Sequence, residues 1–310
     1  MGNTRFADID GIRTRYFEAG TGEPMVLIHG AHFGSSAGGA HNWMPIFPHL
    51  ASRFHVYAFD KLGMGLTDNP AADADYSMDG TVRHALGFIR KMGIQKAHLV
   101  GHSRGGLPAA SIAVNHPEMA ATLIIFDSNT LAPVDPPPVT ADLPPAGPPP
   151  TRESLRRELA RFAVGSGWFT EEYVTAELEI ALHPKTRQAA EKLELLRSRW
   201  VERNPEKVKA RPALARNSGT GWWLYQVKDQ TLQAIRAGRL KTPTLIVWGM
   251  NDPGAPYTMG VELMELISKS VGRAQLHVLN RCGHFAFGEY PVEVANLMFN
   301  FVTAGGKQYG

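Results

Sequence analysis

Short runs of apolar residues recur along the chain and constrain its fold more than any other feature. The clearest of them occupy residues 25–29, 55–60, 98–101, 122–127, 244–248 and 275–279. Each run is nearly continuously apolar, which is typical of strands that helices cover on both faces. Segments of helix length, such as 77–92 and 105–116, separate them. This alternation of strand and helix predicts an α/β fold with a mostly parallel sheet.

The two ends of this pattern are also informative. Asp10-Gly11 separates two short runs between Thr4 and Glu18, and this dipeptide tolerates the positive φ values of a tight hairpin turn. After Ser128 the alternation stops, because residues 132–150 hold 9 of the 22 prolines and cannot form helix interiors or central strands. A helical pattern follows from 151 to about 239. We therefore expect a core of residues 1–131 and 241–310, with a proline-rich linker and helical lid over 132–240.

Composition excludes several classes of protein. The 44% hydrophobic and 20% charged residues of the 310-residue chain are ordinary globular usage. No apolar run approaches the ~18–20 residues of a membrane span, and the first ten residues lack the pattern of a secretion signal, so we expect a cytoplasmic protein without a membrane partner. The single cysteine, Cys282, excludes an intrachain disulfide and a cysteine-rich metal site.

The net charge of +3 is too small to indicate nucleic-acid binding. Its excess lies in residues 151–216, which carry 14 Lys and Arg against 10 Asp and Glu. Two interpretations of this excess stay open. The segment forms helices with solvated charged faces, or it lies on the path by which an anionic substrate approaches. The glycine-containing stretches at 34–36 and 63–65 lack the third glycine or the lysine of phosphate-binding loops, so we expect no nucleotide cofactor.

The pentapeptide Gly101-His102-Ser103-Arg104-Gly105 matches G-x-S-x-G and lies between a predicted strand and a predicted helix. A serine on such a sharp turn needs small neighbours, and its hydroxyl is exposed at the carboxyl end of the sheet. Ser103 is therefore the expected nucleophile. One backbone donor for a developing oxyanion is expected from the amide of Arg104, which follows the serine directly.

A serine nucleophile needs a base, and the base needs a carboxylate that fixes its tautomer. Asp252 follows the run 244–248 and His284 follows the run 275–279, so both lie at the carboxyl ends of predicted strands. The chain order Ser, Asp, His is that of the α/β-hydrolase triad. Asp127 also ends a strand and stays open as the acid, whereas Asp60 is expected to cap the following turn.

The loop after the first buried strand carries further candidates. His29-Gly30-Ala31 has the form of an HG-x turn, so the amide of Ala31 is the expected second oxyanion donor. We expect His29 to be structural. A metal site at His29, His32 and His41 is disfavoured, because these histidines lie on a glycine-rich loop without carboxylate partners or helical spacing.

Three stretches extend the comparison to a known family: His29-Gly30 with Asn42-Trp43 and the turn from Asp60 to Gly65, then Ser198-Arg199-Trp200, and finally Arg281-Cys282-Gly283-His284. On these motifs the chain resembles the α/β-hydrolase superfamily over nearly its full length, and within it the meta-cleavage product hydrolases. Those enzymes cut a C–C bond in dienoic acids formed by ring-opening of aromatic compounds. The resemblance implies a mostly parallel eight-stranded sheet flanked by helices, an inserted helical lid, no cofactor, and Arg199 as the residue that binds the substrate's carboxylate.

The resemblance has departures in the predicted pocket. This chain has His102 and Arg104 where the family usually has asparagine and methionine around the serine, and Phe285 where the family usually has tryptophan. With Asn42, Trp200 and Arg199, His102 and Phe285 are the expected substrate-binding residues. The substrate is expected to be small, anionic and partly aromatic, and a homodimer is possible. A carboxylesterase for aromatic or acidic monoesters is the alternative function, and a non-catalytic ligand-binding member of the fold is a third.

Overall fold

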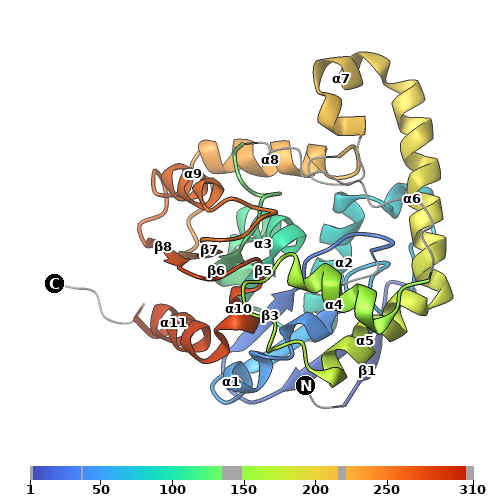
Figure 1. Ribbon diagram of the computed structural model, residues 1–310. Coiled ribbons are helices and arrows are strands. Elements are labelled where there is room, and N and C mark those ends of the chain that lie inside the picture. The colour runs from blue at the N-terminus through green and yellow to red at the C-terminus, as the bar shows by residue number, and fades with distance from the viewer. Residues whose placement is uncertain (1–2, 36–37, 135–148, 216–220, 305–310) are drawn as a thin grey trace.

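The computed structural model describes residues 3–35, 38–134, 149–215 and 221–304. Its centre is an eight-stranded sheet with the order β1-β2-β4-β3-β5-β6-β7-β8 (Figure 1). The strands are β1 (Arg5–Ile9), β2 (Ile12–Ala19), β3 (Pro24–Ile28), β4 (His55–Phe59), β5 (Ala97–His102), β6 (Ala120–Phe126), β7 (Thr244–Gly249) and β8 (Ala274–Leu279). β2 pairs antiparallel with β1 and β4, and every other pair is parallel. The expected mostly parallel eight-stranded sheet is confirmed.

The hairpin between β1 and β2 turns where the sequence predicted. Asp10 and Gly11 have φ values of 51° and 85°, and Ile9 pairs with Ile12 across the turn. Positive φ at both turn residues matches the right-handed twist of the flanking strands, which explains the Asp-Gly dipeptide.

Helices cover both faces of the sheet, and this accounts for the continuous apolar runs. On β3, Val26 and Ile28 pack into one apolar cluster while Met25 and Leu27 pack into the other. The first cluster lies under α2 (Met78–Lys91), α3 (Gly106–Asn115), α8 (Tyr225–Arg236) and α9 (Thr258–Ile267), and the second under α1 (Phe47–Ala51), α10 (Ala286–Glu289) and α11 (Pro291–Thr303). Because successive side chains of a strand point to opposite faces, both registers must be apolar.

Several helical turns are short 3-10 segments. They are η1 (Ala40–Trp43), η2 (Asp73–Asp75), η3 (Ser103–Gly105), η4 (Pro117–Met119) and η5 (Pro212–Ala215). Of these, η1 and η3 lie at the carboxyl ends of β3 and β5 and carry residues of the site described below. None of the described helices has both the length and the apolar character needed to cross a bilayer.

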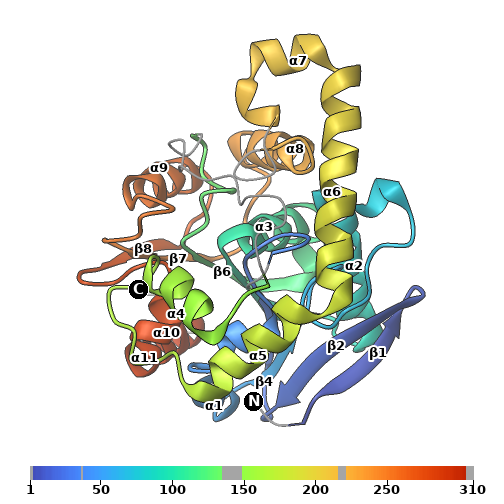
Figure 2. The same cartoon turned by 45° about the vertical axis from the view of Figure 1, so that its right-hand side comes forward.

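The chain between β6 and β7 is helical where the structure describes it. It forms α4 (Arg152–Ala160), α5 (Glu171–Leu182), α6 (Pro184–Arg203) and α7 (Pro205–Ala210), and in both views α6 runs along one side of the molecule and carries α7 away from the sheet (Figures 1 and 2). The hydroxyls of Thr151 and Thr170 cap α4 and α5, and Pro184 is the first residue of α6.

The division into core and lid stays a proposal. Residues 135–148, which include most of the proline-rich stretch, lie outside the described residues. The expected lid also included α8, but α8 packs on α3, and its side chains Leu232 and Ile235 belong to the larger apolar cluster of the core. We therefore propose that the lid ends before Tyr225.

Candidate active site

Ser103 lies on a sharp turn between β5 and α3. Its φ of 50° is in the left-handed region, which costs a non-glycine residue about 1–3 kcal/mol unless the surroundings enforce it. A side chain at Gly105 would place its Cβ 2.1 Å from the carbonyl oxygen of Ile28, so only glycine fits there. The Ser128 hydroxyl donates to the Ser103 carbonyl oxygen over 2.6 Å and helps to hold the turn. The strained serine is thus fixed at the carboxyl end of the sheet.

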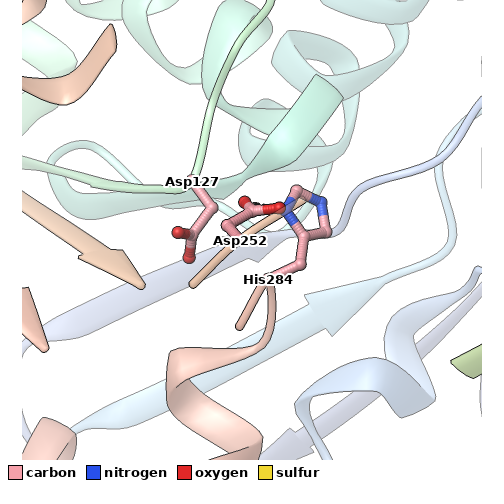
Figure 3. A group of neighbouring side chains, drawn as sticks. All are labelled: Asp127, Asp252 and His284. Carbon is pink, nitrogen blue, oxygen red and sulfur yellow. Dashed lines mark hydrogen bonds and ion pairs between the residues drawn. The ribbon is translucent and has the colours of Figure 1, made fainter. Parts of the chain in front are cut away.

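Asp252 and His284 form a close pair. The carboxylate oxygen Oδ2 of Asp252 lies 2.5 Å from Nδ1 of His284 (Figure 3). Its other oxygen, Oδ1, accepts hydrogen bonds from the backbone amides of Gly254 (2.8 Å) and Ala255 (3.1 Å). With both oxygens engaged by donors, Asp252 is set to accept from a protonated Nδ1. The other ring nitrogen of His284, Nε2, then has a free lone pair.

Asp127 lies on the far side of Asp252 from His284, as Figure 3 shows. Its carboxyl is fully buried at the end of β6, and its Oδ1 accepts from the amide of Gly249 over 2.8 Å. Burial, together with the charge of Asp252, raises the pKa of Asp127 well above its ordinary value. Its second oxygen, Oδ2, is buried without a hydrogen-bond partner, and within the described part of the chain Asp127 forms no hydrogen bond with His284.

One group of side chains has the composition of a metal site. Ligand atoms of Asp127, Asp252 and His284 all lie within 4.8 Å of one another. The hydrogen bonds described above occupy both oxygens of Asp252, and Nδ1 of His284 carries the proton of that contact. The arrangement therefore fits an acid–histidine pair beside a second buried carboxyl group better than a set of metal ligands.

His102 connects the serine turn to His284. Its Nε2 lies 2.9 Å from the carbonyl oxygen of His284, and the two rings are 4.7 Å apart. Burial lowers the pKa of His102 well below its ordinary value, so the ring is neutral and Nε2 carries the proton that it donates. Among the described residues, no hydrogen bond joins the Ser103 hydroxyl to His284, and His102 is the link between them. We expected His102 to bind substrate, whereas in the structure it positions His284.

The loop after β3 approaches the serine closely. A Cβ on Gly30 would lie 3.0 Å from Cβ of Ser103, and Ala31 has a φ of 62°. His29 holds this loop: its Nδ1 donates to the carbonyl oxygen of Gly30 (2.9 Å), and its Nε2 accepts from the amide of Lys61 (3.0 Å). Burial lowers the pKa of His29 well below its ordinary value, in agreement with this neutral tautomer. His29 is therefore structural, as the sequence predicted.

The three loop histidines do not converge on one point. Nδ1 of His32 lies 2.6 Å from the hydroxyl of Ser35. His41 instead points to the lid, where its Nε2 lies 3.1 Å from Oε1 of Glu177. Each histidine thus has a separate partner, which removes the geometric basis for a shared metal ion.

Asn42 contacts the lid instead of an open pocket. Its Nδ2 lies 2.5 Å from the hydroxyl of Tyr173 and 3.3 Å from Oε1 of Glu177, both on α5. The amide of Gly38 donates to the other carboxylate oxygen of Glu177 over 3.2 Å. Glu177 was not predicted from the sequence, because a single glutamate on a charged helix gives no local sign that it is buried. Asn42 was expected to bind substrate, but in the structure its Nδ2 donates to the side chains of Tyr173 and Glu177.

Phe285 lies where the lid meets the core. Its ring centroid is 5.1 Å from that of Trp168, 5.4 Å from that of His102 and 5.4 Å from that of His284. Phe285, Trp168 and Tyr173 belong to one apolar cluster, and Phe285 brings this cluster into contact with the imidazole of His284.

Comparison with known proteins agrees with this geometry. A family model for the alpha/beta hydrolase fold matches residues 23–291. The chain belongs to the α/β-hydrolase family. This hydrolase is 31% identical to a 2-hydroxymuconate semialdehyde hydrolase of Pseudomonas sp. (strain CF600), over 94% of this chain and 91% of the relative. It is 29% identical to the 2-hydroxy-6-oxo-6-(2'-aminophenyl)hexa-2,4-dienoic acid hydrolase of Metapseudomonas resinovorans, over 96% and 90% of the two chains.

A solved structure extends the likeness. The meta-cleavage product hydrolase of Pseudomonas fluorescens IP01 shares 26% identity with this hydrolase and superposes with a TM-score of 0.73, covering 98% of both chains. The expected resemblance to meta-cleavage product hydrolases is thereby confirmed.

Two expected substrate-binding residues of this hydrolase are not brought to the serine. Arg199 is exposed on α6, and the ring of Trp200 stacks on Trp222 and contacts Tyr225 at centroid distances of 6.3 and 5.9 Å. Within the described residues, neither forms a hydrogen bond, ion pair or ring contact with the serine turn or with His284. The physical reason is the direction of α6, whose C-terminal end leads away from the sheet (Figure 2).

Proposed function

We propose that this chain is a serine-dependent hydrolase that cleaves a C–C bond in a 2-hydroxy-6-oxo-dienoate, the type of product formed when an aromatic ring is opened. The relatives named above carry this activity in their names, at 29–31% identity over almost the whole chain. The observation that carries the proposal is the 2.5 Å contact between Nδ1 of His284 and Asp252, beside a serine on a strained strand-to-helix turn. This pairing gives His284 the tautomer that a general base for a hydroxyl requires.

The proposed reaction begins when the dienol substrate is converted to its keto form. His284 then accepts a proton from Ser103, or from a water molecule, as that oxygen attacks the substrate's carbonyl carbon. The backbone amides of Ala31 and Arg104 donate to the oxyanion that forms. Cleavage of the C–C bond leaves a carbanion stabilised as a dienolate, which takes the proton back from His284. Where Ser103 is the attacking group, a water molecule then hydrolyses the acyl-serine with His284 as the base, which releases the carboxylic acid and restores the hydroxyl. Net addition of one water yields a carboxylic acid and a 2-hydroxydienoate.

The alternative function is hydrolysis of aromatic or acidic monoesters by the same three residues. The observation in its favour is the commitment of Asn42 and His102 to contacts within the protein. Both residues were expected to bind substrate, and a site in which they are engaged within the protein is also compatible with a simple ester.

A substrate panel separates the two functions. The panel contains ring-fission dienoates, followed through loss of their visible absorbance, together with a p-nitrophenyl ester and a phthalate monoester. We expect the highest kcat/KM on a dienoate and loss of all activities in Ser103→Ala. An enzyme that is fastest on neutral short esters, and slower by tenfold or more on every dienoate, is a carboxylesterase, and the C–C hydrolase proposal is then wrong.

A further inference from the structure

Two cationic side chains lie next to the serine turn without a carboxylate partner among the described residues. Arg104 directly follows Ser103, and its Nε is buried with no hydrogen-bond partner. Lys61 is 3% exposed, and its Nζ donates to the carbonyl oxygen of Ala31 over 3.0 Å. Neither forms an ion pair in the described part of the chain. Sequence reasoning assigned a role only to the backbone amide of Arg104, and none to Lys61.

The surroundings of this pair are strongly positive. Burial lowers the pKa of Arg104 to about 10, so its guanidinium is still charged at pH 7. Burial, and then the charge of Arg104, lowers the pKa of Lys61 well below its ordinary value, and the same two causes lower that of His32. Removing a charge from water without a partner costs several kcal/mol. A bound anion would offset this cost.

The pair is also placed next to the reacting atoms. Lys61 holds the carbonyl of Ala31, whose amide is the proposed oxyanion donor, and Arg104 supplies the other amide. A small cavity on this side of the loop is lined by Ala31, His32 and Lys61 together with the apolar side chains of Leu62 and Trp223. Lys61 lines this cavity and Arg104 follows Ser103 in the chain, so an anion bound by the two side chains would lie beside the loop that carries the amide of Ala31.

Two of the residues first expected to bind substrate are less suitable as partners of a carboxylate. Nδ2 of Asn42 already contacts Tyr173 and Glu177, and the second of these is itself a carboxylate. A substrate carboxylate placed beside Glu177 would be repelled by it. Arg199 is exposed on the part of α6 that leads away from the sheet (Figure 2).

We propose that the guanidinium of Arg104, with the ammonium of Lys61 beside it, binds the carboxylate of the substrate. This inference rests on the proposed function for the identity of the substrate. It assigns to Arg104 two separate tasks: the backbone amide donates to the oxyanion, and the side chain selects anionic substrates. A planar guanidinium is suited to the second task because it can donate two parallel hydrogen bonds to a carboxylate.

The test compares side-chain variants that keep the backbone amide. Arg104→Met removes the charge at similar length, Arg104→Lys retains it, and Arg203→Met removes an exposed arginine of α6 as the matched control. For Arg104→Met we expect kcat/KM on a ring-fission dienoate to fall about 10–150-fold, since a hydrogen bond to a charged group is worth about 1.5–3 kcal/mol. On a neutral p-nitrophenyl ester the fall should be at least about tenfold smaller than on the dienoate, since that substrate has no carboxylate to bind. Arg104→Lys should recover part of the loss, and Arg203→Met should change neither activity.

Two results would overturn the inference. Equal losses of kcat/KM on the anionic and the neutral substrate would mean that the Arg104 side chain supports the serine turn and does not bind the substrate's carboxylate. A selective loss on the anion in Arg199→Met, without one in Arg104→Met, would place the carboxylate at the lid. If Arg104→Met does not fold, Arg104→Gln carries the same comparison.

The proposed anion subsite can be tested independently of the proposed C–C hydrolase function. Should the wild-type enzyme not cleave dienoates, a phthalate monoester and its neutral diester measure the same charge selectivity. A selective loss on the monoester in Arg104→Met then supports the anion subsite although the C–C hydrolase proposal is wrong. An equal loss on monoester and diester rejects the subsite.

Discussion

The carboxyl groups of Asp127 and Asp252 lie within 4.8 Å of each other at the carboxyl ends of the neighbouring strands β6 and β7. Two carboxylates so close in a buried site do not both ionise readily. Asp252 accepts hydrogen bonds on both oxygens, whereas one oxygen of Asp127 has no partner among the described residues. Burial and the neighbouring carboxylate raise the pKa of Asp127, and Asp252 is the carboxylate that accepts from His284.

This asymmetry predicts different outcomes for the two amide substitutions. Asp252→Asn should lower kcat by about 10⁴-fold, because an amide at this position favours the wrong imidazole tautomer of His284. Asp127→Asn keeps the size of the side chain and an acceptor for the amide of Gly249, and Asp127 does not contact His284 through a hydrogen bond, so the substitution should act mainly on stability. Steady-state kinetics and urea unfolding of both variants check this. If the kinetic losses were reversed, the acid would belong to β6.

Removal of the Ser103 hydroxyl should abolish turnover while the fold is preserved. Loss of one member of a catalytic triad typically costs about 10⁴–10⁶-fold in kcat. Ser128→Ala is the matched control: it removes a neighbouring hydroxyl that supports the Ser103 carbonyl, which Thr130 still contacts at 3.3 Å. We expect it to cost at most about tenfold, the value of one hydrogen bond. A Ser103→Ala variant with more than about a tenth of the wild-type rate would show that another group is the nucleophile.

The buried carboxylate of Glu177 should attach the lid to the core. Glu177→Leu leaves the amide of Gly38 and the hydroxyl of Tyr173 without their acceptor, and each buried unsatisfied group costs about 1–3 kcal/mol. We expect a loss of about 3 kcal/mol in the free energy of unfolding and faster proteolysis within residues 149–215. Glu177→Gln keeps an oxygen acceptor and should lose clearly less. Equal losses in the two variants would mean that the charge of Glu177, and not its hydrogen bonding, holds the lid.

The sequence predicted those parts of the site that a parallel sheet brings together. Ser103, Asp252 and His284 each follow a strand of the sheet, and the carboxyl ends of parallel strands meet at one edge, so their placement at the same edge follows from the fold class. The lid contacts could not be predicted in this way. Asn42 and Glu177 are 135 residues apart, and nothing local in either segment specifies how α5 docks.

The exposed position of Arg199, which was expected to bind substrate, has the same origin. The resemblance of Ser198-Arg199-Trp200 to a family motif predicted that Arg199 lies in the substrate pocket. The direction of a helix, however, is set by its packing against other elements and not by three residues. Likewise, the pattern G-x-S-x-G identified the turn without showing that His102 hydrogen-bonds the backbone of His284, a contact that spans 182 residues.

Buried neutral histidines should make stability depend on pH below neutrality. His84 is the best case, because it is 6% exposed, its Nε2 lies 2.8 Å from the hydroxyl of Thr14, and burial lowers its pKa from 6.5 to about 4. In the unfolded chain His84 takes up a proton below pH 6.5, whereas in the folded chain it stays neutral down to about pH 4. Its contribution to stability is therefore fully present above pH 6.5 and is lost progressively as the pH falls from 6.5 to 4.

The size of this effect can be measured with one variant. Between pH 7 and pH 5 the linkage of His84 alone amounts to about 2 kcal/mol. The raised pKa of Asp127 makes the folded chain more stable as the pH falls, which is opposite to the effect of His84. This contribution is the same in wild type and in the variant, so it cancels in the comparison. His84→Gln stays uncharged at every pH and offers polar atoms to Thr14. Urea unfolding at the two pH values should show that wild type loses about 2 kcal/mol more than His84→Gln on acidification. Identical losses would show that His84 is protonated in the folded chain at pH 5, and the neutral, buried histidine inferred from the structure would be wrong.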